Sequence, residues 1–241
     1  MNAPILYVPL AIEWVILITA LMPRLLVGMF NNIPKFGLFL WFTYFVSSVI
    51  ASAVAIGVTI WALAEYIELI WGPSSIELEI FNHLGLWALV AFSGILIALL
   101  NLKTEPLISE ASIARKELAS ASRVLGEFNG VEIRELAFPV PLAFVANVAG
   151  KNAILISNSA VEGLAQKELE AMYWHEIGHI RGRHNLVRAL AKLVALVTPI
   201  LSASKLFAAE TDRLTEIIAD NYAKRHVDEE ALTSARAKFL E

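Results

Sequence analysis

The sequence predicts an α+β protein that is anchored in a membrane, with apolar N-terminal helices followed by a mostly helical domain that contains a small β-sheet. Hydrophobic residues make up 57% of the chain and charged residues only 17%. The mean hydropathy of +0.63 is well above that of average soluble domains. The longest uncharged stretches lie before residue 103. We therefore expect a membrane domain at residues 1–102 and a globular domain at residues 103–241.

Three apolar stretches are candidates for transmembrane helices. Residues 36–64 and 84–102 contain no charged residue, and each is long enough to cross about 30 Å of hydrocarbon. Residues 4–22 are of similar length but contain Pro9 and Glu13, so this stretch either crosses the membrane or lies flat on it. The first basic residue follows this stretch instead of preceding it, which predicts an anchor rather than a cleaved signal peptide.

The distribution of basic residues predicts the orientation. The loop at residues 23–35 contains two basic residues and the segment after residue 102 contains several, whereas residues 65–83 contain none. Because basic loops stay in the cytoplasm, we expect a multi-pass integral membrane protein whose domain at residues 103–241 is cytoplasmic.

In this second domain, short apolar runs alternate with turn sequences. Apolar residues recur at steps of three and four along residues 107–128, which predicts an amphipathic helix. The Asn-Gly pair at residues 129–130 predicts a turn, and residues 131–138 alternate as a short or bulged strand does. Residues 142–148 and 153–157 surround Gly150 and predict a hairpin.

Helices are expected after the hairpin. Ser157 or Ser159 can cap a short helix, and a long helix follows Gln166. Residues 186–209 are apolar but are interrupted by three basic residues and a proline. We expect them to form a pair of core or membrane-surface helices, with a re-entrant segment as the alternative.

The sequence HEIGH at residues 175–179 is the strongest chemical signal in the chain. In a helix, His175 and His179 lie one turn apart on the same face, so both imidazoles can bind one Zn²⁺ at about 2.0–2.1 Å. Glu176 then lies beside the metal, where it can accept a proton from a water molecule. The alternative is a buried helix with two incidental histidines.

A catalytic zinc site needs a third protein ligand, and the sequence offers two alternatives. His184 is one place short of the position that a third histidine takes in a known arrangement, and on a continuing helix it would point away. We expect it to pack or to form a surface hydrogen bond at the helix end. Glu216 can instead ligate the metal while Asp220, four residues on, accepts a hydrogen bond from a ligand histidine. The alternative for these two carboxylates is a solvated acidic face.

The position of these ligands restricts the membrane topology. One crossing within residues 186–209 would place His179 and Glu216 on opposite sides of the bilayer. Two crossings need about 40 residues, and only 36 lie between the two ligands. This is why we do not expect residues 186–209 to span the membrane.

The motifs HEIGH at residues 175–179 and EIIAD at residues 216–220 together resemble those of HtpX-type and CAAX-prenyl-protease-type membrane metallopeptidases of the gluzincin class. The resemblance covers residues 142–223. It implies a zincin-like domain that binds one Zn²⁺ per chain through His175, His179 and Glu216. It also implies Glu176 as the general base, Asp220 as the partner of a ligand histidine, and an edge strand near residues 142–148 that binds extended peptides by strand addition.

The chain departs from this pattern in two respects. The interval between the motifs is too short for the hydrophobic hairpin that family members often contain, and it is similar to the metallopeptidase domains of beta-lactam sensor proteins. Only 25 residues follow Glu216, so a downstream transition-state stabiliser is not obvious. His226 and Arg225 are the candidates for that role.

These observations predict a membrane-bound zinc metalloendopeptidase that hydrolyses peptide bonds of membrane or misfolded proteins. Its expected partners are a protein or peptide substrate and the lipid bilayer. A net charge of −4 and the lack of a basic cluster argue against nucleic acid, and the absence of cysteine excludes disulfides and thiolate metal sites. The alternative function is a membrane-bound metal-binding sensor or scaffold with little turnover. Substrate-specific processing or signalling, as opposed to general quality control, is a third possibility.

Overall fold

The computed structural model describes residues 3–71, scattered positions between 76 and 102, residues 117–118 and 120–197, and residues 202–239. Most of the predicted span at residues 84–102 lies outside these described residues, and so do most of residues 107–121 of the helix predicted at residues 107–128. The chain forms two compact units. One unit comprises Met1–Phe30, Phe36–Thr104 and Leu193–Glu210, and the other comprises Asn31–Lys35, Glu105–Lys192 and Thr211–Glu241.

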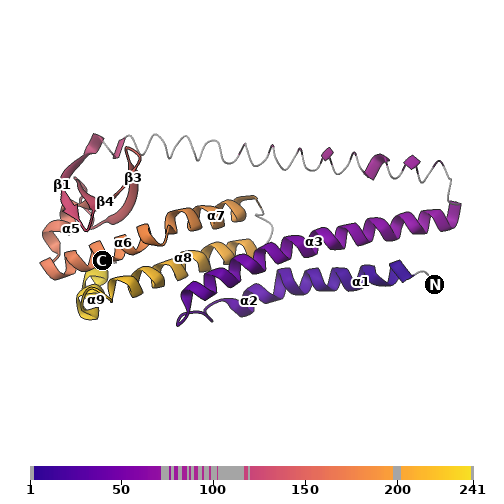
Figure 1. Cartoon of the computed structure of the whole chain (residues 1–241), viewed down its shortest axis with the longest axis horizontal. Helices are drawn as coiled ribbons and strands as arrows, with labels where there is room; N and C mark the ends of the chain where they lie inside the picture. Colours follow the sequence, from indigo (N-terminus) through magenta and orange to yellow (C-terminus); the bar gives the residue numbers. More distant parts are fainter. Residues whose placement is uncertain are drawn as a thin grey trace. The chain divides into compact units, whose positions relative to one another are not determined.

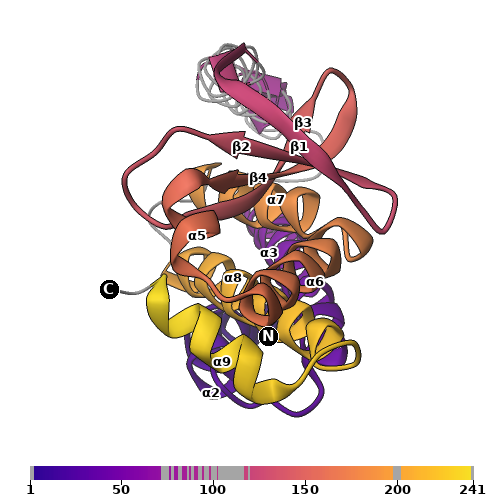
Figure 2. The same cartoon turned by 90° about the vertical axis from the view of Figure 1, so that its left-hand side faces the viewer.

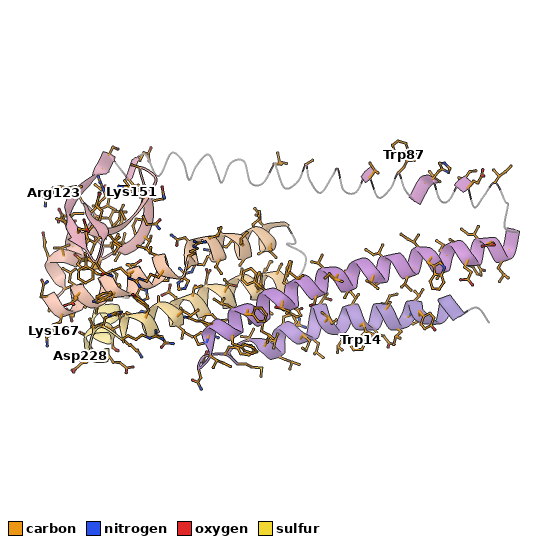
Figure 3. The ribbon with its side chains drawn as sticks, viewed as in Figure 1. Trp14, Trp87, Arg123, Lys151, Lys167 and Asp228 are labelled. Atoms are coloured by element: carbon orange, nitrogen blue, oxygen red, sulfur yellow. The ribbon has the colours of Figure 1, made fainter. Side chains whose placement is uncertain are left out.

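The first unit is helical. It contains α1 (Ala3–Ile16), a π-helical turn (Leu17–Leu21), α2 (Met22–Leu26) and the long α3 (Pro34–Trp71) (Figure 1). Two stretches, Tyr7–Leu26 and Pro34–Ile70, are long and apolar enough to cross a membrane, and they include most of the spans predicted at residues 4–22 and 36–64. Trp14 and other large apolar side chains are exposed along these helices (Figure 3), as is typical of helices that contact lipid.

The second unit contains a mixed four-stranded sheet with the order β1-β2-β4-β3. Its strands are β1 (Ser122–Phe128), β2 (Val131–Leu136), β3 (Ala143–Val148) and β4 (Lys151–Ser157). The β1–β2 and β3–β4 pairs are antiparallel, and β2 pairs with β4 in parallel. The hairpin predicted around Gly150 is confirmed, and β3 is an edge strand of the sheet.

The prediction that a helix continues to residue 128 is wrong, because residues 122–128 form strand β1. The reason lies in the turn that follows. Asn129 and Gly130 have φ values of 48° and 80°, the backbone that a two-residue hairpin requires, and this pairs β1 with β2. The short or bulged strand predicted at residues 131–138 is strand β2, which ends at Leu136, and the bulge lies instead on β1, between Val124 and Gly126.

The remaining helices are α5 (Asn158–Gly163), α6 (Gln166–Arg181), α7 (His184–Val197), α8 (Ser202–Ala223) and α9 (Glu229–Lys238). Ser157 caps α5, because its Oγ accepts a hydrogen bond of 3.2 Å from the Ala160 amide. The described residues within 186–209 fall on the two helices α7 and α8. Neither is among the helices of the described residues that could span a membrane.

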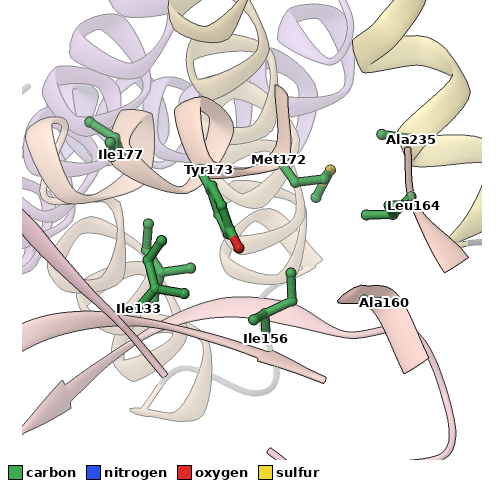
Figure 4. Close-up of a cluster of buried hydrophobic side chains, with 9 residues drawn as sticks. Ile133, Ile156, Ala160, Leu164, Met172, Tyr173, Ile177 and Ala235 are labelled. Carbon is green, nitrogen blue, oxygen red and sulfur yellow. The ribbon is translucent and has the colours of Figure 1, made fainter. Parts of the chain in front are cut away.

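Helix α6 covers one face of the sheet (Figure 2). Ile133, Ile154 and Ile156 of the sheet pack against Tyr173 and Ile177 of α6. Figure 4 shows this cluster, to which α5 and α9 also contribute. Because Tyr173 and Ile177 hold α6 on this apolar face, the opposite face of the helix presents His175 and His179 to α8.

Candidate metal centre

The polar face of α6 is buried. His175, Glu176 and His179 are each about 5% exposed, although polar side chains of this kind are rarely buried without partners. The Nε2 atoms of His175 and His179 lie 3.1 Å apart. The i, i+4 spacing of the motif therefore brings two imidazole nitrogens to one point, as the sequence predicts.

Glu216 of α8 completes a cluster with these two histidines. Its Oε2 lies 3.4 Å from Nε2 of His175, and its Oε1 lies 3.6 Å from Nε2 of His179. Four ligands at about 2.0–2.1 Å around a tetrahedral metal are separated by about 3.4 Å. Two neutral imidazoles and one carboxylate are also the donors of known catalytic zinc sites. The three side chains therefore fit a zinc ion.

Asp220 lies behind the first histidine. Its Oδ1 is 2.9 Å from Nδ1 of His175, and both atoms are buried without another partner among the described residues. A carboxylate at this position retains the imidazole proton on Nδ1, which leaves Nε2 free to bind a metal. The structure thus brings Asp220 to the place that the sequence predicts.

Two arginines that the sequence did not single out contact the carboxylates of α8. Nη2 of Arg188 lies 2.5 Å from Oε1 of Glu216, and Nη2 of Arg236 lies 2.9 Å from Oε2. Arg236 also pairs with Asp220. These guanidinium groups hold the Glu216 carboxylate in place from α7 and α9.

The electrostatics differ between the two histidines. Burial lowers the pKa of His175, but its contacts with the Asp220 and Glu216 carboxylates outweigh burial and raise that pKa to about 9. Burial and the nearby charge of His175 lower the pKa of His179 to about 3. Because a metal ligand must be a neutral imidazole, metal binding would compete with protonation of His175.

The two glutamates also differ. Burial raises the pKa of Glu216, but hydrogen bonds with His175 and Arg188 outweigh this effect and hold it well below its ordinary range. Burial raises the pKa of Glu176 to about 7. Glu216 is therefore a permanent anion, whereas Glu176 exchanges a proton near neutral pH, as a general base must.

A cavity of about 320 Å³ opens onto the cluster. Ala143 and Phe144 of the edge strand β3 line it, together with Met172, Asn185 and Phe239 and the charged residues described above. The side chain of Asn185 donates a hydrogen bond of 3.2 Å to the Val145 carbonyl of β3. The cavity thus connects the three candidate metal ligands with strand β3 at the edge of the sheet.

The remaining candidates lie elsewhere. The ring of His226 stacks on Trp174, with centroids 3.8 Å apart. Arg225 and His226 line a different hollow, together with Lys167 and Asp228, so the structure does not bring them to the metal cluster. His184 is 2% exposed, which agrees with the expected packing role and not with a surface hydrogen bond. It does not lie on a continuation of the motif helix, because α6 ends at Arg181 and His184 begins α7.

A helix with the motif HExxH and a carboxylate from a later helix together define the candidate centre of a metallopeptidase. Residues 116–218, slightly less than half of the chain, match the sequence model of peptidase family M48. This match supports a metallopeptidase function for that part of the chain, and a peptidase implies a peptide or protein substrate. No curated protein matches the chain.

Proposed function

We propose that this chain is a membrane-anchored zinc metalloendopeptidase, related to the HtpX and CAAX-prenyl-protease types, that cleaves membrane or misfolded proteins. The observation that carries the proposal is the convergence of His175, His179 and Glu216 at 3.1–3.6 Å, with Glu176 buried beside them. The catalytic domain would lie on the cytoplasmic side of a multi-pass anchor, as the basic loops indicate.

Each side chain has a distinct role in this proposal. Bound by His175, His179 and Glu216, zinc would polarise the scissile carbonyl and lower the pKa of a water molecule. Glu176 takes the proton of the attacking water and passes it to the leaving amine. Asp220 keeps His175 in the tautomer that presents Nε2.

The open edge of β3 is the expected binding site of an extended substrate. The Ser157 amide donates to the Leu142 carbonyl at 2.9 Å, so Leu142 directs its backbone groups to β4. In an antiparallel ladder these directions alternate. Ala143 and Val145 therefore direct their N–H and C=O groups to the outer edge of β3. Asn185 already binds the Val145 carbonyl there, so a peptide that adds as a further strand beside Glu176 would pair with Ala143 and share or displace the Asn185 bond.

The experiment is proteolysis of an unfolded protein such as casein by the detergent-purified full chain, with and without a chelator. We expect about one zinc per chain, and cleavage that the chelator abolishes. The variant Glu176→Gln should retain zinc but lose cleavage by at least about a hundredfold. Zinc-loaded Glu176→Gln protein that still cleaves would contradict the assigned mechanism.

A membrane-bound sensor or scaffold with a gluzincin fold is the second candidate. Two observations favour it: Arg188 and Arg236 engage both oxygens of Glu216, and the predicted stabilisers Arg225 and His226 line a different hollow. The similarity of this chain to the metallopeptidase domains of beta-lactam sensors also favours this candidate. Stoichiometric zinc without cleavage of any unfolded protein would support this candidate over the first.

A further inference from the structure

A histidine that the proposed mechanism does not use lies directly behind a metal ligand. Nδ1 of His184 is 2.9 Å from Nδ1 of His179, and the two rings meet edge to face at 84°, with centroids 4.9 Å apart. His184 is 2% exposed. The contact is therefore a buried one between the first residue of α7 and the second histidine of the motif.

The backbone between α6 and α7 is shaped to admit this ring. Arg183 has a φ of 50°, which ends the path of α6 and turns the chain back toward His179. A Cβ added to Gly182 would overlap the ring of His184 at Nε2. Gly182 itself has φ −78° and ψ −5°, a conformation open to any residue. Glycine is needed here for space and not for its backbone freedom.

The proton between the two rings follows from metal binding. If Nε2 of His179 binds zinc, the neutral imidazole carries its proton on Nδ1. Nδ1 of His179 must then donate, and Nδ1 of His184 must accept. In this arrangement His184 gives His179 what Asp220 gives His175: an acceptor that selects the tautomer and orients the ring.

We propose that His184 is a positioning residue for the metal centre, which holds His179 in its zinc-binding tautomer and orientation. This proposal rests on the proposed zinc site. It explains three features together: the burial of His184, the turn at Arg183, and the lack of a side chain at residue 182. Each ligand histidine would then have its own partner, from α8 for His175 and from the start of α7 for His179.

The test is the dissociation constant of Zn²⁺, measured on the full chain in detergent by competition with a chromophoric chelator. We expect His184→Leu to weaken zinc binding about 10–100-fold, the usual effect of removing such a partner. His184→Asn should recover most of the affinity, because its amide oxygen can accept the same proton. The visible spectrum of the Co²⁺-loaded protein should change in the leucine variant and return toward wild type in the asparagine variant.

Gly182→Ala provides an independent variant. It retains the imidazole of His184 and a permitted backbone, but displaces the ring, so we expect weaker zinc binding in the same direction as His184→Leu. If His184→Leu does not fold, this variant tests whether His184 positions His179. His83→Asn is the matched control, because it removes a histidine of the other unit, and zinc affinity should not change.

The possible outcomes separate this proposal from the proposed function. A wild-type chain that binds no zinc would contradict both. A wild-type chain that binds zinc, with equal affinity in His184→Leu and Gly182→Ala, would overturn the role of His184 alone. Equal weakening by the leucine and asparagine substitutions would also overturn it, because a residue that only fills space gains nothing from an acceptor oxygen.

Discussion

Gly178 of α6 lies against the backbone of α8 at Ala219: a Cβ added to Gly178 would be 3.0 Å from the Cα of Ala219 and 3.2 Å from its carbonyl oxygen. Ala219 lies between Glu216 and Asp220 in the sequence of α8. The glycine inside the motif thus permits the close approach of two helices that carries both carboxylates to the histidines.

We predict that Gly178→Ala separates the two helices and moves Glu216 away from the histidines. The added methyl group meets backbone atoms, which cannot rotate away, and overpacking of this kind costs about 1–3 kcal/mol. Zinc affinity should fall together with the melting temperature. Titration with a chelator and thermal unfolding in detergent measure the two effects.

Gly163→Ala is the matched control for this prediction. It is also a helical glycine, but a Cβ there would have no atom within 4 Å. Zinc affinity should therefore be unchanged. A Gly178→Ala variant that behaves like the control would show that the distance between α6 and α8 does not determine the metal centre.

A second prediction concerns Asp220. Replacement by Asn retains the size of the side chain but removes the charge beside Nδ1 of His175, and it introduces an amide that can present an N–H group to that atom. We expect zinc affinity to decrease about 10–100-fold. Unchanged affinity in Asp220→Asn would mean that the 2.9 Å contact does not control the tautomer of His175.

Much of this centre is predictable from the sequence because its spacing is local. His175, Glu176 and His179 lie within about one turn of a helix, as Glu216 and Asp220 do, and helical geometry determines which way these side chains point. The hairpin around Gly150 is predictable for the same reason. In both cases a few residues that are close in the sequence determine the local conformation.

The parts that the sequence did not reveal depend on contacts between distant segments. Arg188 and Arg236 belong to no recognisable sequence motif, and only the tertiary fold brings them next to Glu216. The position of His184 depends on one positive φ at Arg183, which no periodic pattern signals. Residues 122–128 have the apolar spacing of a helix, but pairing with β2 outweighs it. The overlap between His184 and a side chain at residue 182 was likewise visible only in three dimensions.

A third prediction concerns Arg236, which contacts both Glu216 and Asp220. Without this guanidinium group, the two carboxylates would repel each other unless a metal supplies the positive charge. We therefore expect Arg236→Gln to lower the melting temperature in the presence of a chelator and to have a smaller effect with zinc. Thermal unfolding under both conditions measures this difference.

Arg123→Gln is the control for the third prediction. Arg123 forms a 2.6 Å ion pair with Glu135, but its side chain is 75% exposed, and exposed pairs contribute little to stability. Its substitution should change the melting temperature slightly, and equally with and without zinc. If Arg236→Gln lowers the melting temperature equally with and without zinc, then the arginine and the metal do not neutralise the same carboxylates.

The last prediction concerns pH and the contact between α6 and α9. Glu168 of α6 accepts hydrogen bonds from Lys238 at 2.6 Å, Ser234 at 2.6 Å and the Ala165 amide at 2.7 Å. These contacts, with Lys238 the largest cause, lower the pKa of Glu168 from 4.5 to about 2. The folded state therefore binds this proton less readily than the unfolded state does. Its contribution to stability is complete above pH 4.5 and is lost as the pH falls toward 2.

It follows that Glu168→Gln should lower the melting temperature at pH 7, and that the difference from wild type should shrink as the pH falls below 4.5. Lys238→Met should reduce the same pH dependence, because it removes the strongest of the three contacts. Glu162→Gln, which removes a charge from an exposed residue of α5, is the control and should change the melting temperature at pH 7 much less than Glu168→Gln does. A constant difference between Glu168→Gln and wild type from pH 7 to pH 2 would contradict the prediction, since a group with equal pKa values in the folded and unfolded states contributes no pH dependence.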